Sequence, residues 1–261
     1  ALAPAAVEAA DRLLRAGLLD AYLSPADRVR FEEAGAMAQV WRARAASLFR
    51  VEIPAEAATG QIHRYAAELG LPSAAAVASI DGQPLVFHAL SLRADGSPVP
   101  IVNSDEGFDL LFGQPSAADL DLYIGGIMRP FPAGLMTDVG LLVANGAFVD
   151  KAMQARFSPA AYHGAVVWSW QQALLAAGLA RQIGRTDLPA PVRRKLQAAQ
   201  TVLWRAIAAT RAVQSSELWS WTYRDGRYQV VPFGAGKADV DESNAAQLWS
   251  TVYLAVQPPV R

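Results

Sequence analysis

The sequence contains no cysteine and only three histidines, and both shortages limit its chemistry. Without cysteine the chain can form neither a disulfide nor a thiolate nucleophile. His63, His88 and His163 do not have the spacing of metal ligands, so we expect no metal site. The sequence also has no G-x-S-x-G motif and no glycine-rich phosphate-binding loop. These absences argue against a serine hydrolase of the elbow type and lead us to expect no cofactor.

The chain also lacks an excess of charge and a long apolar run. Its 23 Lys and Arg residues nearly balance 24 Asp and Glu residues, which gives a net charge of −1. This balance gives no electrostatic reason to expect nucleic acid or an anionic membrane as a partner. No apolar run approaches the roughly 18–20 residues that a membrane-spanning helix needs. The composition leaves the compartment open among periplasmic, secreted and cytoplasmic.

Most of the chain has the residue pattern of α-helices. Its 261 residues, 52% of them hydrophobic, are enough for one large domain or two small ones, with a sizeable core. Asp81-Gly82, Asp95-Gly96 and Asp225-Gly226 are tight-turn signals that predict small β-hairpins between helices. We therefore predict an all-α domain over 1–261 with one or two hairpin insertions. Apolar spacing predicts helices over 4–19, 24–49, 55–69, 116–128, 164–183 and 190–213, and a last helix from near Ser243.

An unusual group of side chains occurs at 162–178, which reads YHGAVVWSWQQALLAAG. Aromatic rings can lie flat on the apolar faces of sugar rings, while amides bond sugar hydroxyls. This combination at the start of a predicted helix indicates one wall of a carbohydrate site. The simpler reading is a half-buried histidine, core tryptophans and ordinary helix amides. The candidate sugar-binding residues in this stretch are Tyr162, His163, Trp168, Trp170 and Gln171.

A second aromatic stretch, SSELWSWTY at 215–223, contains the carboxylate Glu217. Trp219 and Trp221 follow it and are further candidates for sugar binding. A carboxylate among aromatic side chains is partly desolvated, which raises its pKa and suits it to acid–base chemistry. The alternative is a solvated glutamate at the end of a helix.

The pair Asp105-Glu106 is the third candidate element. It follows Asn103-Ser104 and precedes an apolar stretch, which is the composition of a helix N-terminus. The two carboxylates could therefore serve as general acid, general base or hydroxyl ligands. They could equally do no more than cap a helix.

Taken in order, these motifs resemble a family of enzymes. YHGAVVWSWQQALLAAGL resembles the YHxGxVWPxxxxLIAxGL segment of six-hairpin glycosidases, such as glycogen-debranching enzymes, processing α-glucosidases and mannosylglycerate hydrolases. Asn103-Ser104 with Gly107 resembles their SN-x-G segment. SELWSWTYRDGRY, PFG and DESNAAQLWSTVYLAV resemble their C-terminal end. In this sequence Ser169 stands where that family has a proline, and Gly164 comes one place earlier than the family's glycine.

The resemblance covers about 100–258 and implies a fold and an activity. The fold would be an (α/α)6 toroid, or the C-terminal part of one. The activity would be hydrolysis of an α-glucoside or related oligosaccharide with inversion, with Glu217 as general base and no cofactor. In inverting enzymes the two carboxyl groups lie about 6.5–9.5 Å apart, which leaves room for a water molecule.

One part of the family pattern is absent from this sequence: the upstream aspartate that acts as general acid. Three expectations follow from its absence. The acid lies on a missing N-terminal barrel segment, or Asp105 or Glu106 supplies it, or the chain is a non-catalytic carbohydrate-binding or scaffold relative. A partial barrel would expose apolar helix flanks, so we also expect association with the missing segment or with a second copy.

Overall fold

The computed structural model describes residues 2–234, 251 and 253–259, and about 51% of it is helix and 16% strand. Its α-helices are α1 (Leu2–Arg15), α2 (Pro25–Glu32), α3 (Ala34–Phe49), α4 (Ala55–Glu68), α5 (Ala74–Ala78), α6 (Glu106–Phe112), α7 (Ala117–Met128), α8 (Lys151–Arg156), α9 (Ser169–Ile183) and α10 (Ala190–Ala209). Its strands are β1 (Arg50–Ile53), β2 (Leu85–His88), β3 (Ser91–Leu92), β4 (Pro98–Val99), β5 (Val102–Asn103), β6 (Met136–Thr137), β7 (Gly140–Leu141), β8 (Ala144–Asn145), β9 (Val167–Trp168), β10 (Leu218–Arg224) and β11 (Arg227–Pro232).

The fold is mixed α/β, so the predicted all-α class, with its (α/α)6 toroid or C-terminal part of one, is wrong. Within the described residues the strands form five small antiparallel sheets, ordered β1-β2, β3-β4, β5-β8, β6-β7 and β11-β10-β9. Four of the strands come from 129–168, where prolines, glycines and valines disfavour a continuous helix. Several strands pair with segments far away in the chain, and local residue patterns do not show such pairing.

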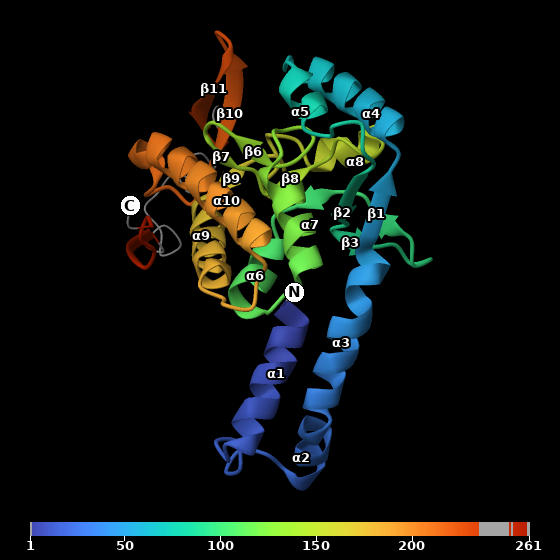
Figure 1. The fold of residues 1–261 in the computed structure, drawn as a ribbon, viewed down its shortest axis with the longest axis vertical. Coiled ribbons are helices and arrows are strands. Elements are labelled where there is room, and N and C mark those ends of the chain that lie inside the picture. Colours follow the sequence, from blue (N-terminus) through green and yellow to red (C-terminus); the bar gives the residue numbers. More distant parts are fainter. Residues whose placement is uncertain (1, 235–250, 252, 260–261) are drawn as a thin grey trace.

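Two antiparallel helices form an arm that projects from the rest of the molecule (Figure 1). Helix α1 leads away from the body, α2 lies at the far end, and α3 returns to β1. Only Ala34 and Ala38 are buried within the arm. An ion pair of 2.5 Å between Arg42 and Glu8 links its two long helices. We call this unit, residues 2–49, the arm and the remainder the body.

Much of the arm's apolar surface is uncovered. The large apolar side chains exposed on it are Leu2, Leu13, Leu18, Tyr22, Val29, Met37, Val40, Trp41 and Leu48. Monomeric proteins rarely expose so much apolar surface in one region. The expected association with another segment or a second copy stays a prediction. The exposed apolar side chains of the arm are consistent with it, because association would bury them.

The body is organised around α9, which packs against both α6 and α10. The approach of α6 and α9 is close because two glycines lie at the contact: a Cβ on Gly178 would lie 2.8 Å from the Cβ of Leu110, and one on Gly107 would lie 3.0 Å from Leu174. Helix α7 packs against α10 and against β2. Buried leucines, isoleucines and alanines from all these elements form one main core.

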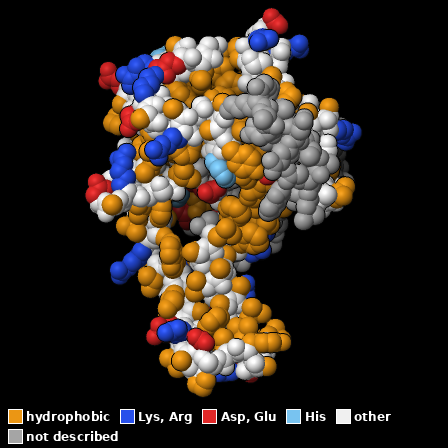
Figure 2. All heavy atoms as spheres, turned by 180° about the vertical axis from the view of Figure 1, so that it is seen from behind, with side chains coloured by type: hydrophobic (Ala, Val, Ile, Leu, Met, Phe, Trp, Pro, Cys, Tyr) orange, Lys and Arg blue, Asp and Glu red, His pale blue; other side chains and the backbone are white. Residues whose placement is uncertain are grey.

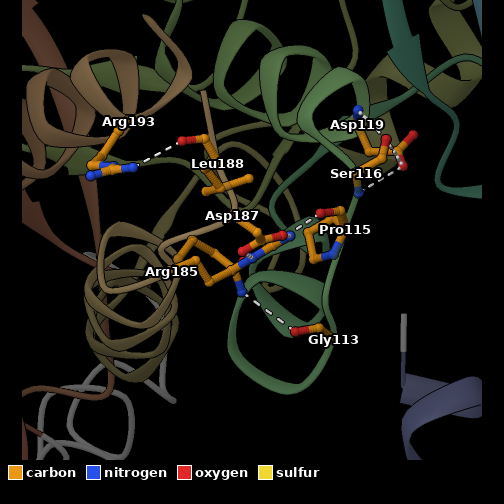
Figure 3. A network of polar contacts seen from close by, with 9 residues as sticks. Gly113, Pro115, Ser116, Asp119, Arg185, Asp187, Leu188 and Arg193 are labelled. Atoms are coloured by element: carbon orange, nitrogen blue, oxygen red, sulfur yellow. Dashed lines mark hydrogen bonds and ion pairs between the residues drawn. The ribbon is translucent and has the colours of Figure 1, made fainter. Parts of the chain in front are cut away.

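A polar network fixes the loop after α9 to the loop after α6 (Figure 3). Gln182 donates to the carbonyl of Leu110 at 2.5 Å, and Arg185 donates to the carbonyl of Pro115 at 2.7 Å. Arg185 also forms a two-bond pair with Asp187. The network holds the ends of α6 and α9 together, and so helps to fix the opposite ends of these helices, where the candidate site lies.

Local signals predicted several boundaries correctly. The Ser24 hydroxyl accepts from the backbone of Asp27 at the start of α2, and Ser116 forms a capping box with Asp119 at the start of α7. The turn at Asp225 joins β10 and β11 as predicted. Other boundaries differ: the predicted helix 24–49 divides at Glu33, and the predicted hairpin within 77–102 reduces to β3 and β4, because β2 pairs with β1.

The predicted helix 164–183 begins only at Ser169, because Val167 and Trp168 form strand β9 and the residues before them form turns and bends. A Cβ on Gly164 would lie 2.2 Å from the carbonyl oxygen of Ser158, and Val167 pairs with Trp219 in the three-stranded sheet. The predicted helix from Ser243 begins outside the described residues. None of the described helices has the length and hydropathy that a membrane span requires.

The close packing of α6 on α9 makes a testable prediction. Replacement of Gly178→Ala should lower the free energy of unfolding by about 1–3 kcal/mol, because the new methyl group collides with the backbone of α6. Gly60→Ala in α4 is the matched control, since nothing lies within 4 Å of its Cβ position. That change should stabilise the protein by about 0.5–1 kcal/mol. Urea unfolding curves measure both, and equal effects would contradict the proposed packing.

Candidate functional site

The candidate site is a cluster of polar and aromatic side chains at the N-terminal end of α9. Strand β9 pairs with the start of β10, so Trp168 lies opposite Leu218. The backbone N–H and the hydroxyl of Ser169 both donate to the carbonyl of Glu217, at 2.9 and 3.0 Å. These bonds hold the stretch 162–171 directly against Glu217, the predicted base.

Four aromatic rings of this stretch lie in contact. The ring of Tyr162 lies 5.1 Å from that of His163 and 4.9 Å from that of Trp168, centre to centre. Trp170 follows at 5.7 Å from Trp168, and its other neighbour is Phe108 of α6, at 5.9 Å. Tyr162 is 38% exposed and His163 is also exposed, whereas Trp168 is 9% exposed. Of these side chains, Tyr162 and His163 are exposed and Trp170 is half-buried.

The carboxylate of Glu217 lies beneath this aromatic group. Its Oε1 accepts a hydrogen bond from the hydroxyl of Tyr162 at 2.5 Å, and the residue is only 7% exposed. The indole N–H of Trp168 donates to the backbone carbonyl of Tyr162 at 3.0 Å, which fixes the tyrosine backbone above the carboxylate. A tyrosine at the surface is thus bonded to the buried carboxylate of Glu217.

Asp105 reaches the same cluster from the start of α6. Its Oδ1 accepts from the side-chain amide of Gln171 at 3.3 Å, and Gln171 follows Trp170 on α9. The side chain reaches solvent, but the surrounding protein desolvates it and raises the pKa of its carboxyl group. The amide of Gln171 and the nearby His163 act in the opposite direction and do not cancel this effect.

Glu106 is oriented differently from its neighbour. Its Oε1 pairs with Nδ1 of His88 at 3.0 Å, and burial raises the pKa of the glutamate, although His88 opposes the shift. The ring of His88 packs edge-on against Tyr123 at 5.6 Å, and the hydroxyl of Tyr123 donates to Asp109 at 2.9 Å. Glu106 therefore belongs to a second polar group, with partners of its own.

Trp219 and Trp221 lie in the core. Trp219 is fully buried, and its indole N–H donates to the carbonyl of Val139 at 2.9 Å. Trp221 is 7% exposed and donates to the carbonyl of Ala165 at 2.8 Å. These tryptophans stabilise the junction of β10 with the body, and we do not include them in the site.

A cavity of about 470 Å³ lies between the arm and the body, next to the cluster. Figure 2 shows a hollow where the arm meets the body, with acidic side chains in and beside it. Asp105 borders both the cavity and the aromatic cluster. The charged and polar residues that line the cavity include Arg42, His88, Asn103, Asp105, Glu106, Asp109, Gln114, Asp119 and Tyr123.

Among the described residues no group of three or more His, Asp or Glu side chains has the arrangement of a metal site. The chain matches no known family model, and no curated protein matches it.

Tyr162, His163, Trp168, Trp170 and Glu217 lie together, and their role as a site stays a prediction. The second polar group was not predicted from the sequence. His88, Asp109 and Tyr123 come from three separate elements. The one available signal was the spacing of Glu106 and Asp109, three residues apart and hence on one face of α6. Nothing in the sequence indicated that the arm would close this face into a cavity.

The raised pKa of Asp105 predicts how stability depends on pH. A carboxyl group that is harder to ionise in the folded state stabilises the fold at low pH, and this contribution is lost as pH rises through the folded pKa. Asp105→Asn should therefore gain stability relative to wild type as pH rises from below the ordinary aspartate pKa to 7. Urea unfolding at several pH values measures the difference.

Asp95→Asn is the control with the opposite sign. Hydrogen bonds from Ser97 lower the pKa of Asp95, so its carboxylate stabilises the fold above its ordinary pKa, and this contribution is lost as pH falls. The Asp95 variant should lose stability relative to wild type as pH rises over the same interval. The same sign for both variants would contradict the assigned environment of Asp105.

Proposed function

We propose that the chain is a glycoside hydrolase that acts on an α-glucoside or related oligosaccharide with inversion. One observation carries the proposal. Asp105 bonds Gln171 and so lies in the same cluster as Tyr162, His163 and Trp170, under which Glu217 is held. Two carboxyl groups from separate elements beside exposed rings are the parts that hydrolysis of a glycosidic bond needs.

In the proposed reaction Asp105 is the general acid. Its raised pKa keeps a larger fraction protonated near neutral pH, which suits proton donation to the glycosidic oxygen as the bond to the anomeric carbon breaks. Glu106 is the weaker candidate, because its carboxylate is paired with His88. We therefore assign to Asp105 the role that the sequence left open between the two.

Glu217 is the proposed general base. It would accept a proton from the water molecule that attacks the anomeric carbon, while the leaving sugar takes its proton from Asp105. The hydroxyl of Tyr162 donates to Glu217 and would orient its carboxylate until water enters. The rings of Tyr162, His163 and Trp170 would carry the apolar faces of the sugar, and Gln171 would orient Asp105.

A second candidate function is carbohydrate binding without cleavage. The observation that favours it is the burial of Glu217, which is 7% exposed and already bonded to Tyr162. A base must be reached by water, whereas a carboxylate that only fixes a surface tyrosine need not be. Cleavage assays distinguish the two functions.

The hydrolase proposal predicts the behaviour of two isosteric variants. Glu217→Gln and Asp105→Asn should each lower kcat for maltooligosaccharides on the order of 10²–10⁴-fold, the usual contribution of a general acid or base. Asp105→Asn should recover much of its rate on an aryl glucoside, because a good leaving group needs no proton. Asp95→Asn, in an exposed turn, is the control and should retain wild-type activity.

Product analysis completes the experiment. NMR of the fresh product should show the anomer opposite to that of the substrate, and loss of the acid should remove the alkaline limb of the pH profile. Activity of Glu217→Gln close to wild type would overturn the assignment of the base. Sugar binding by the wild type with no cleavage would support the second candidate function instead.

A further inference from the structure

We infer that the cavity between the arm and the body binds a further sugar unit of the same ligand, either neutral or amino-substituted, and rejects acidic sugars. That the ligand is a sugar rests on the proposed function. Its own evidence is the shape and lining of the cavity, which the roles of Glu217 and Tyr162 do not use.

One wall of the cavity is apolar and aromatic. Trp41, Ala45 and Phe49 are four residues apart, lie on one face of α3 and line the cavity. Trp41 is 44% exposed although it is a large aromatic residue, so its ring surface is available to a ligand. An aromatic face of this kind suits the apolar face of a sugar ring.

The opposite wall is rich in hydrogen-bond acceptors. Asp105, Glu106 and Asp109 lie along one side of the start of α6 and all line the cavity. Each has a bond from one known partner, respectively Gln171, His88 and Tyr123, and a carboxylate can accept several more. The wall therefore suits a ligand that offers many donors, such as the hydroxyls of a sugar.

The charged residues that line the cavity restrict the class of ligand further. Four carboxyl groups line the cavity, since Asp119 joins the three on α6. The cationic side chain in the lining, Arg42, is already paired with Glu8, and His88 is paired with Glu106. A carboxylate or phosphate on the ligand would meet the carboxylates of Asp109 and Asp119 with no unpaired cation among the described lining residues, whereas a neutral or protonated amino sugar would not meet like charge.

The size and position of the cavity fit this role. Its volume of about 470 Å³ is within the range of small-molecule sites, which is about 300–1,000 Å³. Asp105 belongs to both the cavity and the aromatic cluster, so a ligand that extends from one to the other passes this carboxyl group. A sugar chain bound in this way would place a glycosidic bond at the proposed general acid.

The first test measures binding without turnover. Calorimetry with maltotetraose on the Glu217→Gln protein gives the reference Kd, and addition of Trp41→Ala should raise it by about tenfold through loss of the stacking face. Val40→Ala is the matched control, because Val40 is 57% exposed on the same helix and does not line the cavity. It should leave Kd within about twofold of the reference. Equal Kd values for the two variants would overturn the inference.

The second test addresses charge selection. A tetrasaccharide whose terminal glucose is oxidised to glucuronic acid should bind at least about tenfold more weakly than maltotetraose at low salt. Asp109→Asn, which keeps the size of the side chain and can still accept from Tyr123, should reduce that difference. Equal binding of the acidic and neutral sugars by the Glu217→Gln protein would overturn the inferred selectivity.

The outcomes separate this inference from the proposed function. Trp41-dependent binding in a protein that cleaves no sugar would support the cavity and overturn the hydrolase. Cleavage combined with binding that does not depend on Trp41 would support the hydrolase and overturn the cavity as a sugar site.

Discussion

The candidate site depends on the pairing of Ser169 with Glu217. Two donors of Ser169, its N–H and its hydroxyl, bond the carbonyl of Glu217 and join the start of α9 to the start of β10. Backbone hydrogen bonds in a buried place are costly to leave unmade, so this junction is strongly fixed. Because it is fixed, the hydroxyl of Tyr162 lies over the carboxylate, and the aromatic rings before α9 gather beside it.

The second constraint is the close approach of α6 and α9. Gly107 and Gly178 let the helices pack nearer than larger residues would allow, and Gln182 ties their far ends. The approach brings Asp105, at the start of α6, to Gln171 on α9. Two separate contacts thus bring two carboxyl groups to one aromatic cluster. The pairing of β9 with β10 places Glu217, and the close packing of α6 on α9 places Asp105.

The arm has almost no hydrophobic core of its own. It buries only two alanines and leaves large apolar side chains exposed, yet its third helix supplies the aromatic wall of the cavity. The acidic wall comes from α6 in the body. The cavity is therefore formed by two units that meet, and the residue pattern around Trp41 or around Asp109 does not by itself indicate it.

The sequence by itself determined the local features. Ser24 and Ser116 cap helices where predicted, Asp225 begins a tight turn, and the aromatic and amide residues at 162–171 lie together in one cluster, because each of these depends on neighbouring residues. Tertiary structure decided the mixed α/β fold, the burial of Trp219 and Trp221, and the separation of Glu106 from Asp105. The pairing of short strands and the packing of α6 depend on residues far apart in the chain, and no local pattern records which distant segment will satisfy a given backbone or side chain.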